Sequence, residues 1–220
     1  SAAVSFCSAT ANSLRASSFL SAAANQGQAM LRSQHDNTSP PAINTGGRHP
    51  TWSSVYDVYP LPYKGATLAA AFNDAGYDTA MFSSMRLDGE YMDRLMRGMG
   101  YATYYDFAED KARQTPGNTL NSWGAREEVV LPLIERWIDD ANAAGKPFFV
   151  NYLTVATHHP YSVPPDYEKP FDDSQDVGRY LKALHYSVAG IGRLVAHLEA
   201  RGLLDNTIIV YLSDAAEAHH

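Results

Sequence analysis

The side chains best suited to chemistry fall in three short segments. The first, Cys7–Ser13, offers a thiol and several hydroxyls between a short expected strand and an expected helix. A nucleophile at the start of a helix would face backbone N–H groups and the positive end of the helix dipole, which favour an anionic nucleophile and an anionic substrate. Thr10 and Ser13 are three residues apart, so one could attack while the other caps the helix. The alternative is that both are ordinary caps.

The second segment is the His158-His159-Pro160-Tyr161 turn, which follows the most strand-like stretch of the chain. A neutral imidazole can donate to an anion through its N–H or bind a divalent metal through its other nitrogen. Pro160 stiffens the turn and so restricts where the two rings point. The alternative is a pair of surface histidines in a loop.

The third segment is Asp214, directly after an apolar strand. A carboxylate at the end of a buried strand is costly unless it is paired with a cation, a metal or backbone donors. Metal ligation is one solution. The other is that Asp214 caps a following helix, with Glu217 three residues later completing a capping box.

The elements that must position these side chains follow from the hydrophobic pattern, in which strands alternate with helices. Such alternation implies right-handed crossovers and an α/β fold with a mostly parallel central sheet flanked by helices. Ligands bind beyond the carboxyl ends of strands in such sheets, where all three segments are expected. A polar stretch at about 26–63 is predicted to be a long irregular insertion. The predicted strands cover 3–6, 77–82, 148–155 and 207–212, and the predicted helices cover 13–24, 67–76, 91–99, 123–144 and 177–201.

Composition narrows the class of protein. The 220 residues, 45% hydrophobic and 19% charged, fit a globular domain and are too apolar for disorder. A net charge of −7 argues against nucleic acid or an anionic membrane surface as the main partner. No apolar stretch reaches the ~20 residues that cross a bilayer, so a membrane anchor would lie in a segment absent from this chain. Both ends look cut, and we expect a domain truncated at each end.

Three longer stretches resemble the sulfatase-like branch of the alkaline phosphatase superfamily, which includes sulfatases, lipoteichoic-acid-synthase-like enzymes and phosphoethanolamine transferases. The resemblance runs from about residue 5 to 217, and it implies that 1–220 is part of an alkaline-phosphatase-like catalytic domain. The stretches are TLAAAFNDAGYDTAMF at 67–82, GKPFFVNYLTVATHHPYSVPPDY at 145–167 and YLKALHYSVAGIGRLVAHLEARGLLDNTIIVYLSD at 180–214.

The resemblance also implies roles for individual residues. The pentapeptide TANSL, which begins at Thr10, resembles the Thr-x-x-Ser-Leu setting of the nucleophile in phosphoethanolamine and phosphoglycerol transferases. By resemblance, Thr10 is then the nucleophile and a ligand of a divalent metal (Zn, Mn or Ca), with Asp214 as a second ligand. His158 is a catalytic residue at the substrate or leaving group, and Ser13 and His159 bind substrate. The expected location is extracytoplasmic.

Three departures from the family pattern shape the functional prediction. Cys7 lacks the Pro and Arg of the formylglycine motif, the strand ending at Phe82 has no following Lys, and Ala215 replaces the His of Asp-His-Gly. We therefore expect metal-dependent transfer or hydrolysis of phosphate or sulfate esters through a Thr nucleophile, on an anionic substrate such as a lipid headgroup or glycan. One alternative is a degenerate or truncated member that binds an anionic glycan or lipid without turnover. The other is an unrelated phosphomutase or phosphodiesterase on the same fold.

Overall fold

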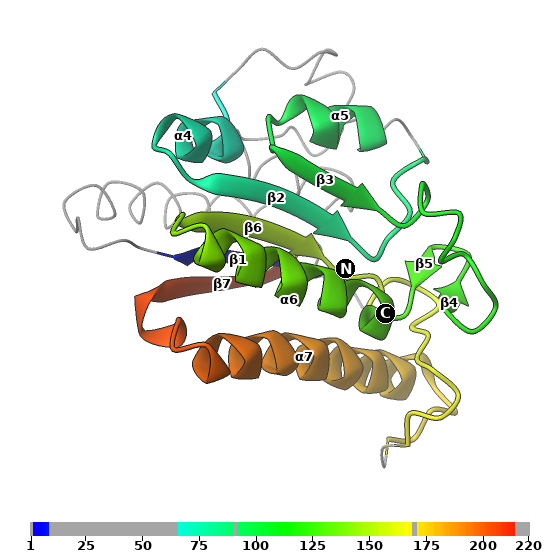
Figure 1. Ribbon diagram of the computed structural model, residues 1–220. Coiled ribbons are helices and arrows are strands. Elements are labelled where there is room, and N and C mark those ends of the chain that lie inside the picture. Colours follow the sequence, from blue (N-terminus) through cyan, green and yellow to red (C-terminus); the bar gives the residue numbers. More distant parts are fainter. Residues whose placement is uncertain (1, 9–65, 90–91, 169–170, 214–220) are drawn as a thin grey trace.

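The computed structural model describes residues 2–8, 66–89, 92–168 and 171–213. Its helices and strands alternate along the chain as the sequence predicts, apart from three consecutive short strands between residues 103 and 125 (Figure 1). In chain order the elements are β1 Ala2–Ser8, α4 Leu68–Asp74, β2 Asp78–Ser83, α5 Met92–Gly98, β3 Thr103–Asp106, β4 Thr119–Asn121, β5 Gly124–Ala125, α6 Glu127–Ala143, β6 Phe148–Leu153, α7 Asp176–Ala200, the 3-10 turn η1 Leu204–Asn206 and β7 Thr207–Ser213.

The central sheet has the strand order β3-β2-β6-β1-β7. Strands β3, β2 and β6 are parallel to one another, whereas β1 is antiparallel to both of its neighbours. Because β6 and β7 both oppose β1, they run in the same direction. The predicted mostly parallel α/β fold is confirmed, with β1 as the one reversed strand among the described residues of this sheet.

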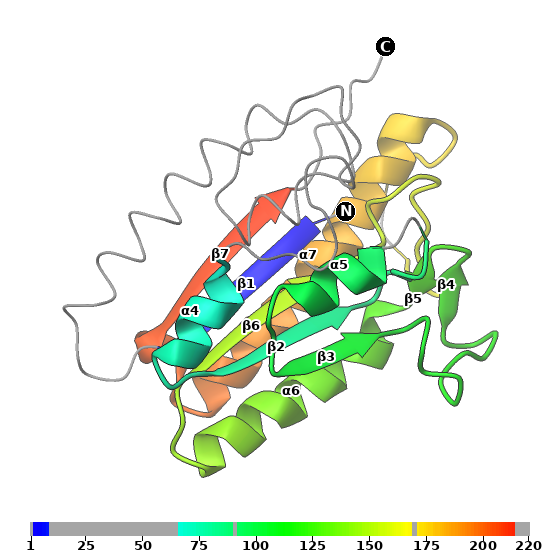
Figure 2. The ribbon, with the colours of Figure 1, turned by 90° about the horizontal axis from the view of Figure 1, so that it is seen from above.

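Helices cover the sheet on two faces (Figures 1 and 2). Side chains of a strand alternate between faces, and β2 shows the consequence: Ala80 and Phe82 join the core under α6 and α7, while Met81 joins the core under α5. The predicted burial of β6 on both faces is confirmed, because all of its residues are buried. Its Phe149 ring stacks on Phe72 of α4 at 4.4 Å between centroids.

The predicted ends of the first described helix are also confirmed. The Thr67 hydroxyl caps α4 by accepting a hydrogen bond from the Ala70 N–H at 3.0 Å, and it donates to the Met99 carbonyl at 2.6 Å. Gly76 follows the helix with φ of +85°, a conformation that glycine adopts without steric cost. These contacts direct the chain from α4 into β2.

Helix α6 begins at Glu127, so the expected start at Trp123 is wrong. Residues 124 and 125 are instead extended and pair with β4 and Met85, which holds Trp123 outside the helix. Strands β3, β4 and β5 were not expected, because short strands of two to four residues carry little periodicity. The expected helix at 13–24 and the insertion at about 26–63 lie outside the described residues.

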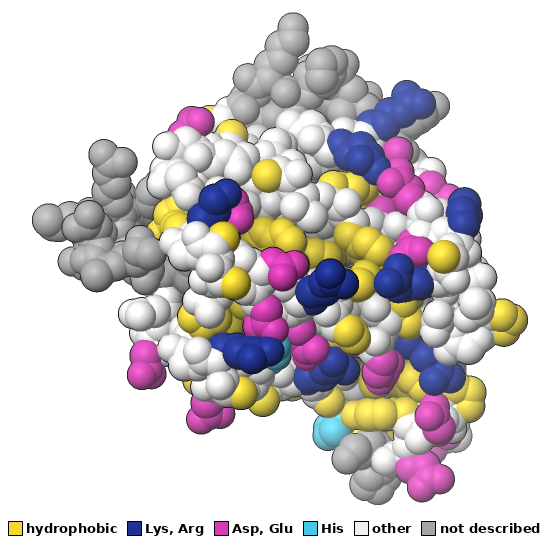
Figure 3. Space-filling view, viewed as in Figure 1, with side chains coloured by type: hydrophobic (Ala, Val, Ile, Leu, Met, Phe, Trp, Pro, Cys, Tyr) yellow, Lys and Arg dark blue, Asp and Glu magenta, His cyan; other side chains and the backbone are white. Residues whose placement is uncertain are grey.

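Ion pairs join the outer surfaces of α6 and α7. Arg193 makes a two-pronged contact with Glu135, at 2.6 and 2.7 Å, and His197 and Arg201 both contact Asp139. Figure 3 shows basic and acidic side chains intermingled on this face. Among the helices that the structure describes, none has the length and apolar character needed to span a bilayer.

Candidate functional site at the carboxyl edge of the sheet

Three segments meet where β2 and β6 end. The Ser84 N–H donates to the Leu153 carbonyl at 3.0 Å, which joins the exits of the two strands. The Ala125 N–H donates to the Ser84 carbonyl at 2.8 Å, and the Arg86 N–H donates to the Trp123 carbonyl at 2.7 Å. The strand exits and the approach to α6 are thereby fixed to one another by backbone hydrogen bonds.

Gly124 is required at this junction. A Cβ built on it would overlap the Ser84 carbonyl oxygen and would lie 3.0 Å from Met85 Cα, and both neighbours are backbone atoms. We expect Gly124→Ala to destabilise the fold by about 3 kcal/mol, the upper range for overpacking a core. Urea unfolding measures this effect, with Gly117→Ala as the control because a Cβ at Gly117 meets nothing within 4 Å. Equal stability of the two variants would contradict the tight approach.

The rings of His158 and Trp123 lie against each other at this edge. Their centroids are 4.4 Å apart, and Trp123 remains 44% exposed. His158 Nδ1 is 2.8 Å from the His159 carbonyl oxygen. Because a carbonyl can only accept, Nδ1 carries the proton, and in the neutral ring Nε2 is the nitrogen with a free lone pair. The pair combines a flat exposed aromatic surface with a group that can exchange a proton.

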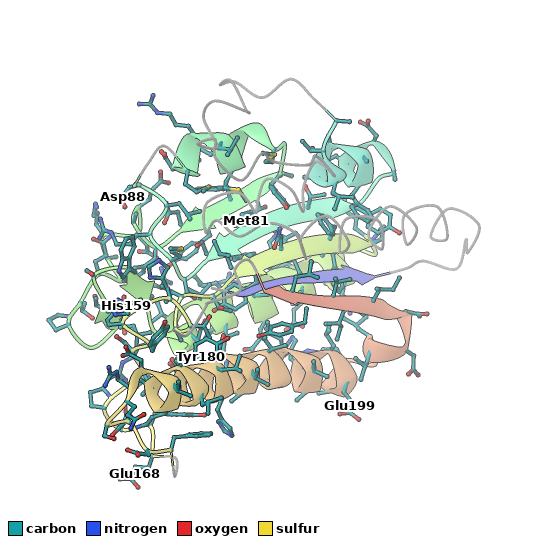
Figure 4. All side chains as sticks on the ribbon, turned by 180° about the vertical axis from the view of Figure 1, so that it is seen from behind. Met81, Asp88, His159, Glu168, Tyr180 and Glu199 are labelled. Carbon is teal, nitrogen blue, oxygen red and sulfur yellow. The ribbon has the colours of Figure 1, made fainter. Side chains whose placement is uncertain are left out.

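His159 has different neighbours from His158. Its ring meets Tyr161 edge-on at 5.4 Å, and Tyr161 in turn meets Tyr180 of α7 at 5.5 Å. Figure 4 shows His159 in the loops beyond the strands, with Tyr180 at the near end of α7. The His159–Pro160 peptide bond is cis, and Tyr161 has φ of +60°. The two predicted histidines therefore lie in one turn, but their rings contact different aromatic side chains.

A buried polar cluster lies behind this turn. The Glu127 side chain is 1% exposed. Its Oε2 accepts hydrogen bonds from the Ser84 hydroxyl at 3.0 Å and from the Tyr152 hydroxyl, and these two hydroxyl groups are themselves 2.6 Å apart. The Glu127 N–H donates to the Tyr186 hydroxyl at 2.9 Å, and that hydroxyl donates to Glu128. Through its side chain and its backbone N–H, Glu127 thus connects the start of α6 with the end of β2, with β6 and with α7.

Burial raises the pKa of two carboxyl groups at this edge. It raises the pKa of Glu127 to about 8, against hydrogen bonds from Ser84 and from the backbone of Val155 and Ala156 that favour the charged form. Burial likewise raises the pKa of Asp106, the last residue of β3, to about 6. The backbone N–H groups of Leu87 and Ala108 donate to Asp106 and oppose that rise.

Three of the predicted site residues, Thr10, Ser13 and Asp214, lie outside the described residues, so their roles stay predictions. The strand directions nevertheless test the expectation that the three site segments lie at the same edge of the sheet. Ala2 pairs with Ser213 and Ser8 pairs with Thr207. The chain therefore leaves β1 at the edge where β7 begins, whereas Asp214 follows the edge where β7 ends. The expectation that the segments after β1, β6 and β7 leave the sheet at one edge is wrong for β1.

The part of the chain that the structure describes contains no set of ligands for the predicted divalent metal. No group of three or more His, Cys, Asp or Glu side chains is arranged there to hold an ion. Both predicted ligands, Thr10 and Asp214, fall outside that part. Metal binding therefore stays a prediction.

Sequence reasoning missed Trp123 and the cluster of Ser84, Glu127 and Tyr152. The predicted helix at 123–144 includes Trp123 and Glu127, and the predicted strand at 148–155 includes Tyr152, so none of them stood out as a site residue. One signal was present: two adjacent acidic residues at 127 and 128 favour a helix start there, because carboxylates stabilise the first turn of a helix. The contact of Glu127 with Ser84, 43 residues away, leaves no local pattern.

Two solved structures share this architecture. The lipoteichoic acid synthase LtaP from Listeria monocytogenes superposes with a TM-score of 0.68 and 16% identity, over 79% of this chain and 43% of that one. A protein in the alkaline phosphatase superfamily from Vibrio parahaemolyticus gives a TM-score of 0.64 and 19% identity, over 79% of this chain and 41% of that one. The fold is of the alkaline-phosphatase-like α/β class.

The chain belongs to the sulfatase family, because the Sulfatase family model matches residues 8–220. It is 24% identical to the lipoteichoic acid synthase-like YvgJ of Bacillus subtilis, over 70% of this chain and 25% of YvgJ. It is 29% identical to phosphoglycerol transferase I of Xanthomonas axonopodis pv. citri, over 55% of this chain and 18% of that protein. The chain thus spans a quarter or less of these two relatives. The resemblance seen in the sequence is confirmed.

Proposed function

We propose that this chain is part of a metal-dependent domain that transfers or hydrolyses phosphate esters through a Thr nucleophile, and that it also binds the substrate and protonates the leaving group. Two lines support a phosphate rather than a sulfate ester: the names of the relatives above, a lipoteichoic acid synthase and a phosphoglycerol transferase, and the absence of a formylglycine motif around Cys7. The proposed substrate class is an anionic ester on a lipid headgroup or glycan. The proposed location is extracytoplasmic, where such acceptors are displayed.

The observation that carries this proposal is the contact between His158 and Trp123. The exposed indole provides a flat surface for the carbon skeleton of a headgroup or sugar. In its doubly protonated form, the His158 ring beside it can donate a proton to the departing oxygen from Nε2, because the Nδ1 proton is held by the His159 carbonyl. His159 and Ser13 are proposed to contact the substrate.

The proposed reaction begins when the Thr10 hydroxyl gives its proton to water and its oxygen attacks phosphorus. The bond from phosphorus to the leaving alkoxide oxygen breaks, and that oxygen takes its proton from His158. Water or an acceptor hydroxyl then attacks the phosphoryl group and gives its proton to His158. The bond from phosphorus to the Thr10 oxygen breaks, and that oxygen takes a proton from water. Asp214 and Thr10 are the residues proposed to hold a divalent cation (Zn, Mn or Ca), which would supply charge neutralisation and a lower hydroxyl pKa.

We expect His158→Ala to lower kcat/KM for a nitrophenyl phosphodiester by about 100-fold, the usual contribution of a general acid. The assay is run with Mn²⁺, Zn²⁺ and Ca²⁺ in turn, and a nitrophenyl sulfate tests the ester class. Since the nitrophenolate leaving group needs little protonation, an alkyl phosphodiester should show a larger loss. His185→Ala is the control, because His185 is an exposed histidine whose side chain contacts Tyr167. Equal losses in both variants would contradict the role of His158.

A second candidate function is binding of an anionic glycan or lipid without turnover. Two observations favour it: the chain leaves β1 at the edge opposite His158, and Ala215 stands where the family pattern has His. This alternative predicts no turnover with any of the three metals. It also predicts that a glycerophosphate-bearing ligand binds measurably by calorimetry and that Trp123→Ala removes this binding.

A further inference from the structure

The carboxyl group of Glu127 is buried between the two segments that carry the candidate site. On one side, Ser84 donates to its Oε2, and the carbonyl of the same Ser84 accepts from Ala125, two residues after Trp123. On the other side, the backbone N–H groups of Val155 and Ala156 are the donors that favour its charged form. The Val155 carbonyl then accepts from the His158 N–H at 2.9 Å. The side chain therefore reaches both ring-bearing segments through one or two hydrogen bonds.

We propose that Glu127 is a positioning residue whose uncharged carboxyl group keeps His158 and Trp123 in contact, and that loss of its proton uncouples the two rings. Its Oε1 is buried and has no hydrogen-bond partner among the described residues. In the neutral acid, leaving Oε1 without a hydrogen bond costs only a modest amount of free energy. In the carboxylate, it would hold an unpaired buried charge, which is far more costly.

None of the titratable side chains that face Glu127 offers its carboxylate a positive charge. From α6 the facing titratable group is Glu128, from β6 it is Tyr152, and from α7 it is Tyr186; β2 contributes Ser84, which does not titrate. Each of these groups is neutral or negative. Relief on ionisation must therefore come from the nearest backbone donors, those of Val155 and Ala156, and movement of that turn displaces His158 from Trp123. The raised pKa of Glu127 places this change in mildly alkaline solution.

The test follows the Glu127 carboxyl ¹³C signal and the His158 ring signals by NMR between about pH 4 and pH 10 in the 220-residue chain. We expect the carboxyl signal to titrate near pH 8. The His158 ring should show an inflection at the same midpoint. A carboxyl midpoint near 4.5, the ordinary value, would overturn the proposal, and so would a His158 signal without the shared inflection.

Variants separate positioning from folding. Glu127→Gln keeps the shape and the neutral state, so the shared inflection should disappear while the His158–Trp123 contact stays. Glu199→Gln, on an exposed residue of α7, should leave the inflection in place. Ser84→Ala should move the midpoint to higher pH, because the Ser84 hydrogen bond favours the charged form. Persistence of the inflection in Glu127→Gln would overturn the proposal, and so would an unmoved midpoint in Ser84→Ala.

A role in catalysis for the coupling between Glu127 and the two rings rests on the proposed function, whereas the coupling itself does not. If the domain turns over a phosphodiester, kcat/KM should fall about tenfold from pH 7 to pH 9, as the neutral fraction of Glu127 falls. Glu127→Gln should make this fall smaller than in the parent chain. The shared inflection without turnover would support the positioning role and reject the enzymatic function. Turnover without the inflection would support the enzymatic function and reject the positioning role.

Discussion

Thr10→Ala is expected to lower phosphodiester turnover by at least ~10³-fold, as removal of a covalent nucleophile does in other hydrolases. No other oxygen can form the proposed covalent bond to phosphorus once this hydroxyl is gone. Steady-state rates with each metal, and loss of labelling of the chain by a phosphorylated substrate, are the measurements. Ser17→Ala is the matched control, since it removes a hydroxyl from the same segment at a residue with no proposed role.

The direction of β1 places a structural requirement on catalysis by Thr10. Ser8 lies beside Thr207, and β1 spans about 20 Å from end to end at ~3.3 Å per residue. Turnover through Thr10 requires the segment after Ser8 to reach the edge that carries His158. If Thr10→Ala keeps rates within threefold of the parent chain, the assignment of Thr10 as the nucleophile is wrong.

Glu127→Gln is expected to make the fold more stable, by an amount that grows with pH. The folded-state pKa of Glu127 is raised from 4.5 to about 8, so the folded chain holds a proton that the unfolded chain has released. The stability of the parent chain therefore falls as pH rises through this window, by about 1.4 kcal/mol per pH unit from this group. Below it, both states are protonated and the loss disappears.

Urea unfolding of both chains between about pH 5 and pH 8 measures the difference, which should reach several kcal/mol at the upper end. Asp106 also titrates in this range with a raised pKa, but it does so in both chains and cancels in the difference. Glu199→Gln should show no such trend. A constant difference between parent and Glu127→Gln across the range would mean that Glu127 titrates normally in the fold.

The elements that the sequence predicted well are those specified by local signals. Thr67 and Gly76 mark the ends of α4 because a hydroxyl cap and a glycine act within one helical turn. The unbroken apolar run of β6 indicated a strand buried on both faces. His158 was identified for a similar reason, since it follows that strand directly.

What the sequence could not predict depends on contacts between distant segments. Trp123 looks like the first residue of a helix until Gly124 is seen packed against the backbone at Ser84, 40 positions earlier. The direction of β1 is set by pairing with β6 and β7, about 150 and 200 residues away, and no local pattern encodes it. The Glu127 cluster draws on four separate elements, so its raised pKa has no counterpart in the sequence.

The division of β2 between two cores limits how this gene segment can change in length. Ala80 and Phe82 point to one core and Met81 to the other. Inserting or deleting a single codon within β2 would exchange these directions for every residue beyond it, so that Phe82 would enter the space that Met81 fills. Loops such as the one around Gly117 carry no such constraint. Length variation in this domain should therefore be confined to its connections, with strand β2 kept at one fixed count of residues.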